Sequence, residues 1–276
     1  MRLEEIDWTV LWREAAGRPR DFPRAGEAET RERWDYMAPR FRRWMDVDDY
    51  PALLLEKIRV EPDWSVLDVG CGTGSIALPL ARKARQVTAL DISGEMLGIL
   101  RDDAKKESLT NITAVQCSWE RALAGKDYGQ HDVVVASRSV GGTMDFRGAV
   151  EKLDRAARRF VYLTVWGGGE RGHHKGVHKL LGRPCPDVPD YVYAFNALYQ
   201  MGIRANVEHL MCHSRLVYDS VEDAVDSCRR DFGGLNPSDE AKVRGFLKKT
   251  LIKLPDGTVE VPDNRPVWTL LWWKKT

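Results

Sequence analysis

The chain has 276 residues, of which 43% are hydrophobic and 30% are charged, and its formal net charge is +1. This length suits one large domain or a core domain with a cap, and the composition is that of an ordinary soluble globular protein. The near-neutral charge excludes a general electrostatic attraction to nucleic acid or to an anionic membrane.

The cysteines and the N-terminal residues bear on the compartment. The five cysteines are an odd number and include no C-x-x-C pair, so we expect neither a disulfide framework nor a zinc knuckle. The first eight residues are acidic and lack the apolar stretch of a signal peptide. No apolar run reaches the ~18 residues of a membrane span. We therefore expect a cytoplasmic protein with reduced thiols and no membrane partner.

Helices rich in tryptophan are predicted at the start of the chain. Asp7 can cap a short helix that ends at Gly17. A second helical pattern of apolar residues runs over 34–45, and Pro39 is expected to kink or split it. A third helix is expected to begin near Pro51, since proline is favoured in the first turn.

Short strands and helices then alternate along the chain. Five runs are rich in β-branched residues: Ser65–Val69, Gln86–Leu90, Ile112–Val115, Asp132–Ala136 and Arg159–Val165. Longer helical stretches separate most of these runs. This alternation predicts a parallel sheet that is covered by helices on both faces.

The C-terminal third follows a different pattern. Two long strands are expected over Val207–Val217 and Pro266–Trp273. Helical segments at 220–230 and 237–250 and a Pro-Asp-Gly turn at 255–257 lie between them. The sequence therefore predicts a late pair of strands with an insertion between them.

The strongest motif is a glycine loop, residues 68–74, with the sequence Asp-Val-Gly-Cys-Gly-Thr-Gly. It follows the first predicted strand and precedes a helix that we expect to begin near Ser75. Glycines suit a sharp turn at which a ligand approaches the backbone, and the N–H groups of a helix N-terminus suit a polar ligand. The third glycine of a dinucleotide fingerprint would fall at Ser75, and the Asp68 carboxylate repels phosphate. The loop therefore favours a cationic ligand over a pyrophosphate.

Asp91 indicates a second feature of this ligand. It stands at the end of the second predicted strand. A carboxylate in that position can accept two hydrogen bonds from the cis-diol of a ribose. Together with Asp68, it predicts a ligand that carries both a ribose and a positive charge.

These residues resemble a known family. The motif D-x-G-x-G-x-G, followed by Val87–Asp91 and Ile92–Leu97, is similar to that of the class I S-adenosylmethionine (SAM)-dependent methyltransferases. The similarity extends to Asn111–Glu120 and His131–Ser139 and is clear over residues 60–165. It implies an α/β, Rossmann-like fold with a seven-stranded, mostly parallel sheet and helices on both faces. An N-terminal helical cap and an insertion before the last strand complete this prediction.

The resemblance also implies which residues bind SAM and its product S-adenosylhomocysteine. They are Asp68, Gly70, Cys71, Gly72 and Gly74 around the methionine part, Asp91 at the ribose, Ile92 and Met96 beside the adenine, and Ser118, Trp119 and Ser137 after the third and fourth strands. Many members of the family have Asp at the position of Ser118, so the serine is a departure. Trp119 has two interpretations, a core aromatic or a contact of the adenine. We interpret Cys71 as a small filler of the loop rather than a reactive thiol.

The cofactor motif does not identify a catalytic residue. The methyl group of SAM is already activated, so a base is needed only if the acceptor must lose a proton. Three candidates for acceptor chemistry are Tyr36 on the predicted lid helix, Arg138 after the fourth strand and His174. For Arg138, an ion pair and a substrate contact are both open. His174 and His178 have the spacing of metal ligands, but nearby glycines argue against a stable helix, so we expect a loop and no metal.

The domain boundaries and the acceptor follow from the same resemblance. Residues 1–50 are expected to form a helical cap or lid, and residues 51–276 the core, with insertions at about 167–200 and 220–262. Such additions are similar to those of the small-molecule branch of the family. Ala136–Val140 lacks the Asn/Asp-Pro-Pro-Tyr sequence of many amino-methyltransferases. We therefore expect a small-molecule methyl acceptor and no nucleic-acid partner; the sequence does not indicate the acceptor atom or the oligomeric state.

Three alternatives remain at this stage. An RNA- or protein-modifying methyltransferase is the enzymatic alternative, and a SAM-binding regulatory protein without turnover is the non-enzymatic one. A nicotinamide-dependent oxidoreductase is opposed by Asp68 and by the glycine spacing.

Overall fold

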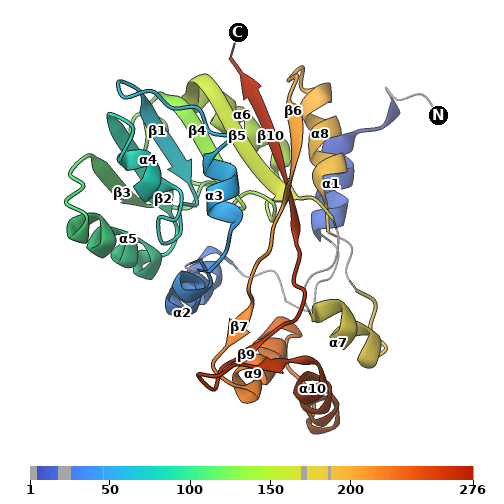
Figure 1. Cartoon of the computed structure of the whole chain (residues 1–276). Coiled ribbons are helices and arrows are strands. Elements are labelled where there is room, and N and C mark those ends of the chain that lie inside the picture. The colour runs from blue at the N-terminus through green and yellow to red at the C-terminus, as the bar shows by residue number, and fades with distance from the viewer. Residues whose placement is uncertain (1–4, 18–25, 46, 169–172, 186–187, 276) are drawn as a thin grey trace.

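The structure is a computed structural model that describes residues 5–17, 26–45, 47–168, 173–185 and 188–275 (Figure 1). The helices are α1 (Trp8–Gly17), α2 (Glu27–Met45), α3 (Tyr50–Leu55), α4 (Ala77–Ala81), α5 (Gly94–Lys106), α6 (Phe146–Ala156), α7 (His174–Leu180), α8 (Tyr191–Gln200), α9 (Val221–Asp231) and α10 (Pro237–Thr250). The strands are β1 (Ser65–Val69), β2 (Gln86–Asp91), β3 (Ile112–Gln116), β4 (His131–Ser137), β5 (Ala157–Trp166), β6 (Asn206–Met211), β7 (Val217–Tyr218), β8 (Ile252–Lys253), β9 (Val259–Glu260) and β10 (Val267–Lys274).

Seven strands form one sheet in the order β3-β2-β1-β4-β5-β10-β6. Strands β1 to β5 run parallel, and β10 pairs antiparallel with both β5 and β6. Every residue of β1 is buried, as expected of a parallel strand that is covered on both faces. The predicted seven-stranded, mostly parallel sheet is confirmed.

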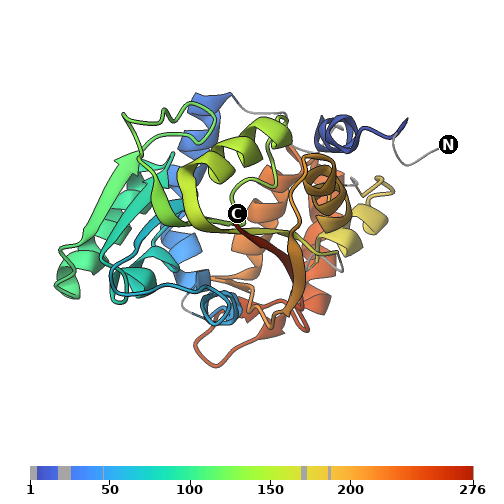
Figure 2. The ribbon, with the colours of Figure 1, turned by 90° about the horizontal axis from the view of Figure 1, so that it is seen from above.

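Helices cover both faces of this sheet (Figure 2). Buried residues of α3, α4 and α5 pack with Val66 on one face. Buried residues of α1, α6 and α8 pack with Leu67 and Val69 on the other face. Successive residues of β1 therefore point into opposite cores, as the geometry of a strand requires.

Helix α1 belongs to the second of these layers. The Trp12 ring is fully buried and stacks on Phe146 with ring centroids 4.1 Å apart. Its Nε1–H donates to the carbonyl of Thr143 at 2.8 Å. Of the predicted cap, α1 thus lies on the sheet, and α2 is the part that crosses the carboxyl edge of the strands.

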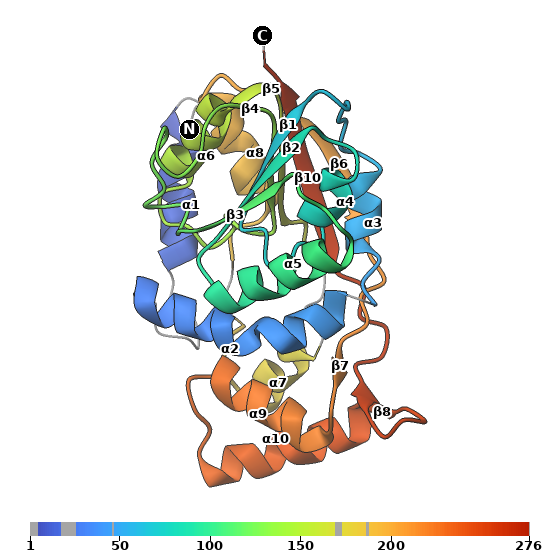
Figure 3. The same cartoon turned by 90° about the vertical axis from the view of Figure 1, so that its left-hand side faces the viewer.

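A third core lies beyond that edge, in what we call the C-terminal subdomain: α7, α9, α10 and the small sheet β7-β9-β8. Val177, Val225 and Leu247 are fully buried in it. Figure 3 shows α2 between α5 on the core side and α9 on the subdomain side. The C-terminal subdomain therefore lies on the side of α2 that is opposite to α5.

The strand predicted over Val207–Val217 is not continuous. β6 ends at Met211, and β7 belongs to the small sheet. The backbone N–H of Cys212 still donates to Pro266, but that of His213 donates to the Asp49 carboxylate at 2.9 Å. The Asp49 carboxylate thus takes the place of a backbone carbonyl on the neighbouring strand, and the chain leaves the main sheet.

Two helical predictions also differ from the structure. Helix α2 runs through Pro39 as one helix, so of the two expected effects of this proline the split is wrong, and the kink stays a prediction. The segment around His174 forms the short helix α7, whereas we expected a loop. Gly176 explains this, because a Cβ there would lie 2.6 Å from the Phe246 ring. The glycine permits close helix packing instead of loosening the segment. In the described part of the chain, no helix has the length and apolar character needed to span a membrane.

Candidate cofactor site

The glycine loop is fixed between β2 and the end of β4. The backbone N–H groups of Gly70 and Cys71 both donate to the carbonyl of Leu90, at 2.7 and 3.0 Å. Gly70 has a φ of +69°, and a Cβ at this position would lie 2.3 Å from the Cβ of Ser139. Only glycine fits this close approach. The loop therefore presents bare backbone at the carboxyl edge.

Asp91 ties the loop to the start of α5. Its carboxylate accepts the Gly72 N–H at 2.8 Å and the Ser93 N–H at 2.9 Å. Burial raises the pKa of Asp91, although these N–H groups oppose the rise. Each carboxylate oxygen has a second lone pair, so the side chain retains capacity for ligand hydroxyls.

Asp68 lies at the centre of the site and is 1% exposed. Neither carboxylate oxygen accepts a hydrogen bond. Burial first, and then the negative charge of Asp91, raise the pKa of Asp68 to about 7, although the nearby N–H of Ala77 lowers it slightly. A buried carboxylate without a partner is costly, and a cationic ligand would relieve this cost. The pair of acids and the bare glycine loop thus fit a ligand such as SAM, with a positive charge and a ribose.

Helix α2 lies directly over these residues. Asp35 accepts hydrogen bonds from the Ser93 hydroxyl at 2.6 Å and from the Glu95 N–H at 3.2 Å. A Cβ on Gly72 would lie 3.3 Å from the Phe41 ring. Near its N-terminus, Glu27 accepts a hydrogen bond from Ser118 at 3.2 Å. Helix α2 therefore contacts the carboxyl edge of the sheet and the start of α5 at three places.

The expected adenine contacts differ in their surroundings. Trp119 points into the core, where its Nε1–H donates to the carbonyl of Ala149 at 3.2 Å and its ring lies 5.1 Å from that of Tyr128. Of its two interpretations, this position favours the core aromatic. Met96 is buried and Ile92 is half-buried. Ile92 follows Asp91 directly in the chain, and Met96 lies in the first turn of α5.

A hydroxyl network lies at the end of β4. The phenol of Tyr50, which is fully buried, hydrogen-bonds Ser137 at 2.7 Å and Thr164 at 2.6 Å. The Arg138 guanidinium lies 3.9 Å above the Tyr50 ring and pairs with Asp48 at 3.1 Å. Of the two open interpretations of Arg138, the ion pair is the one observed. Burial raises the pKa of Tyr50, so this phenol keeps its proton.

Tyr50 and Asp35 were not predicted as site residues from the sequence. Tyr50 is next to the helix-starting Pro51, and Asp35 is one of several acids on a polar helix. No local signal distinguished either residue, because their partners Ser137 and Ser93 are distant in the chain.

Three further residues predicted from the sequence, Tyr36, His174 and Cys71, differ in their position relative to the glycine loop. Tyr36 is 60% exposed, and its hydroxyl accepts a hydrogen bond from Arg230 of α9 at 3.2 Å. His174 lies in the C-terminal subdomain, 3.3 Å from Asp231. Cys71 is buried in the loop, and burial raises the pKa of its thiol well above the usual range. Within the described residues, no group of three potential ligands could hold a metal ion.

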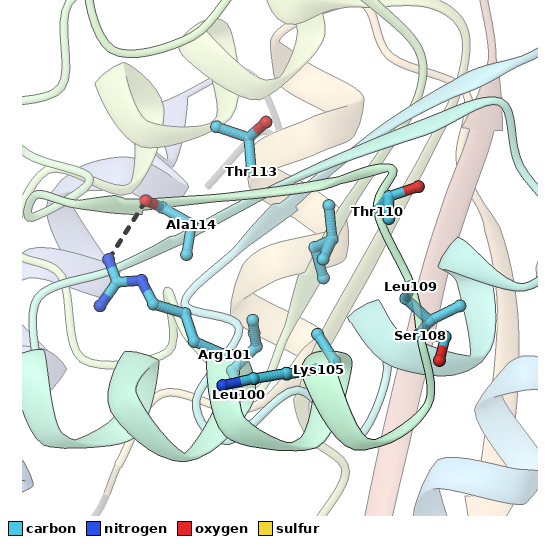
Figure 4. A pocket seen from close by; sticks show the side chains of 10 residues that line it. Leu100, Arg101, Lys105, Ser108, Leu109, Thr110, Thr113 and Ala114 are labelled. Atoms are coloured by element: carbon cyan, nitrogen blue, oxygen red, sulfur yellow. Dashed lines mark hydrogen bonds between the residues drawn. The ribbon is translucent and has the colours of Figure 1, made fainter.

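Two surface hollows lie beside the sheet, and one of them borders the glycine loop. One of about 680 Å³ lies between α5 and β3, at the far edge of the sheet (Figure 4). Another of about 280 Å³ borders the outer side of the glycine loop at Thr73 and Gly74.

Comparisons with known proteins identify the family. Residues 66–159 match the family model described as a methyltransferase domain. An uncharacterized protein of Haemophilus influenzae is 33% identical over 233 residues, which cover 81% of each chain. The solved structure of the YcgJ protein of Bacillus subtilis has a TM-score of 0.53 at 16% identity and covers 82% of this chain and 97% of that one. At this identity, the structural similarity shows the fold alone.

Two further relatives match about a third of the chain. A protein named as a probable cobalt-precorrin-6B C(15)-methyltransferase of Methanobrevibacter smithii is 33% identical over 93 residues, 33% of this chain and 46% of that protein. One named as a probable ribosomal RNA small subunit methyltransferase A of Methanosphaera stadtmanae is 33% identical over 90 residues, 33% and 32% of the two chains. The domain match spans both acids and the glycine loop, and the chain belongs to the class I SAM-dependent methyltransferases, enzymes that use SAM as methyl donor.

Proposed function

We propose that the enzyme methylates a small molecule enclosed between the carboxyl edge of the sheet, α2 and the C-terminal subdomain. The position of α2 carries this proposal. Its Phe41 ring packs on the glycine loop, and on the other side the Trp44 Nε1–H donates to the carbonyl of Val217 in β7 at 2.8 Å. Ligand sites of this enclosed kind suit small molecules, whereas a folded RNA or protein needs an open face.

The same proposal assigns the cofactor contacts. SAM supplies a methyl group on a positively charged sulfur. Asp68 faces the cationic methionine part, and Asp91 accepts hydrogen bonds from the ribose hydroxyls. Ile92, Met96 and Ser118 border the adenine. The chain's own contribution is to bind, to orient and to exclude water, which lowers the barrier by bringing the reacting atoms together.

Two named relatives bear on the acceptor in opposite directions. One is named for cobalt-precorrin-6B and the other for ribosomal RNA, and each matches only 33% of this chain. Because α2 and the C-terminal subdomain lie outside the methyltransferase-domain match at residues 66–159, we assign the choice of acceptor to them. Their closed arrangement favours the small molecule.

Transfer of label from methyl-labelled SAM into a host extract tests the proposal. The purified enzyme is incubated with the extract, which is then separated into metabolite, protein and RNA fractions. We expect label in the metabolite fraction, where mass spectrometry identifies the product. Label confined to RNA or to protein would replace the small-molecule acceptor with that class. SAM binding without any label would favour a regulatory role.

Substitution of Asp91 tests the cofactor assignment separately. We expect Asp91→Ala to raise the Kd for SAM at least about tenfold, because hydrogen bonds to a charged group contribute about 1.5–3 kcal/mol. Titration calorimetry measures the Kd, and circular dichroism checks the fold. Asp102→Ala, an exposed acid on α5, is the matched control and should bind SAM normally. An unchanged Kd for Asp91→Ala would remove the ribose assignment.

A further inference from the structure

A group of buried polar side chains between α2 and the C-terminal subdomain plays no part in the cofactor site. It contains Arg40 of α2, His173 at the start of α7, Tyr218 of β7 and Cys228 of α9. Three of these four residues are less than 7% exposed. The group faces the side of α2 that is turned away from α5.

Arg40 has more donors than partners. One nitrogen of its guanidinium pairs with Asp223 of α9. The Nε and Nη1 atoms are closed to solvent and have no hydrogen-bond partner. Buried donors are nearly always paired in native proteins, and each exception calls for a physical explanation. A guanidinium presents its donors as a planar fork that matches a carboxylate or a phosphate.

His173 supplies another unsatisfied donor. Its Nε2 lies 3.4 Å from the Sγ of Cys228. Burial raises the pKa of that thiol to about 12, so the thiol keeps its proton and can donate to Nε2. Burial also lowers the pKa of His173 to about 3, so the ring is neutral, and we assign its single proton to Nδ1 because the thiol is the partner of Nε2. This Nδ1–H is buried and has no partner.

Both residues with unsatisfied donors contact α9, Arg40 at Asp223 and His173 at Cys228. The His173 ring lies 5.7 Å from the ring of Tyr218, and the charge of Arg40 acts on both Tyr218 and Asp231. The two carboxylates of the area are already engaged. Asp223 pairs with Arg40, and Asp231 lies 3.3 Å from His174. The complement of such a set of donors is an oxyanion.

We propose that Arg40 and His173 bind an oxyanion, a carboxylate or a phosphate, that belongs to the methyl acceptor. This inference rests on the proposed function. The next residue of α2, Phe41, packs on the glycine loop at Gly72. The oxyanion site and the cofactor loop are therefore reached from adjacent residues of one helix. A small molecule held by its anionic group at Arg40 is thus placed beside the methyl donor.

Nuclear magnetic resonance of the arginine Nε–H groups tests the site directly. The full chain, labelled with ¹⁵N-arginine and loaded with S-adenosylhomocysteine, is titrated with inorganic phosphate or with acetate at constant ionic strength. We expect a saturable shift of the Arg40 resonance, which is assigned by its loss in Arg40→Lys. Arg215, an exposed arginine paired with Glu260 at 2.7 Å, is the internal control and should not shift. The arm that saturates at lower concentration identifies phosphate or carboxylate.

Variants separate this inference from the proposed function. Anion affinity, followed through the His173 ring proton, should fall at least about tenfold in Arg40→Lys, which retains the positive charge but loses the fork. It should rise in Asp223→Asn, which removes the competing carboxylate. Calorimetric SAM binding by the same samples checks the fold and the cofactor site. Retained SAM binding with no saturable shift at Arg40, or with equal anion affinity in Arg40→Lys, would overturn the oxyanion site and leave the methyltransferase assignment intact.

The product of the labelling experiment gives an independent check. The methylated metabolite should be retained on an anion-exchange resin at neutral pH. Its formation at low extract concentration should decrease in Arg40→Lys and persist in Arg215→Lys. A neutral or cationic product would overturn the inference even where methyl transfer is observed.

Discussion

Two glycines near the cofactor site have opposite structural roles. Gly70 has a positive φ and lies against Ser139, whereas Gly98 is in the middle of α5 with no atom near its missing side chain. We expect Gly70→Ala to destabilise the fold by about 2–4 kcal/mol, since backbone strain and a clash with the Cβ of Ser139 add. Gly98→Ala should stabilise it by about 0.5–1 kcal/mol. Urea unfolding measures both, and a shared sign would contradict this account of the loop.

Asp68 makes stability and SAM binding depend on pH. Its pKa is about 7 in the fold, above its ordinary 3.8. A raised folded-state pKa means that the relative stability is greatest below the ordinary pKa and is lost as the pH rises toward 7 and beyond. The free energy of unfolding of the ligand-free enzyme, relative to Asp68→Asn, should therefore fall between pH 4 and about 7.5, by on the order of a few kcal/mol.

Binding of the positively charged SAM should offset this loss of stability, because SAM favours the ionised form of Asp68. We expect SAM binding near pH 6.5 to release protons, detected by calorimetry in buffers of different ionisation enthalpy. Asp68→Asn should abolish the release. A proton count that is the same in both proteins would show that Asp68 does not face the positive charge.

At the scale of elements, α2 is held mainly by polar contacts. Ala38 is the one buried residue of its described length. Asp35 joins it to α5, while Arg43 joins it to Asp219 at 3.2 Å. The apolar side chains of this helix are therefore buried less completely than the apolar stripe of most surface helices, so local opening costs less than global unfolding.

Hydrogen exchange should reveal this opening. Amides of α2 should exchange faster than those of α5, and SAM should slow them. Asp35→Ala should speed the exchange of α2 and raise the dissociation rate of SAM, because it removes the contacts to Ser93 and Glu95. Glu32→Ala, an exposed position of the same helix, is the control. Exchange in Asp35→Ala that matches the control would assign the attachment of α2 to other residues.

The sequence predicted the elements whose signal is local. The β-branched runs and the glycine loop identify β1 to β5 and the cofactor edge, since burial on both faces and a close backbone approach restrict residue types at those positions. The break after Met211 was missed, because it depends on an acceptor, Asp49, far away in the chain. The helix α7 was missed for a similar reason: Gly176 is explained by Phe246 of a later helix.

At the scale of the whole molecule, the protein has separate apolar cores joined by polar contacts. Two cores flank the sheet, and the third fills the C-terminal subdomain. The proposed cofactor contacts come from β1, β2 and β4, whereas the acceptor enclosure depends on the subdomain. A substitution that destabilises the third core should therefore reduce methyl transfer and leave SAM binding nearly unchanged.

Leu247 of α10 is fully buried in the third core, and Leu153 of α6 is fully buried against the sheet. We expect Leu247→Ala to lower local stability by about 2–5 kcal/mol. Hydrogen exchange should then increase in α9 and α10 but not in α6, SAM affinity should stay nearly unchanged, and methyl transfer to the metabolite fraction should fall. Leu153→Ala should instead increase exchange throughout the sheet. If Leu247→Ala retained full transfer despite an open subdomain, the acceptor would have to bind on the sheet side of α2 alone, and the enclosure by the subdomain would have no part in catalysis.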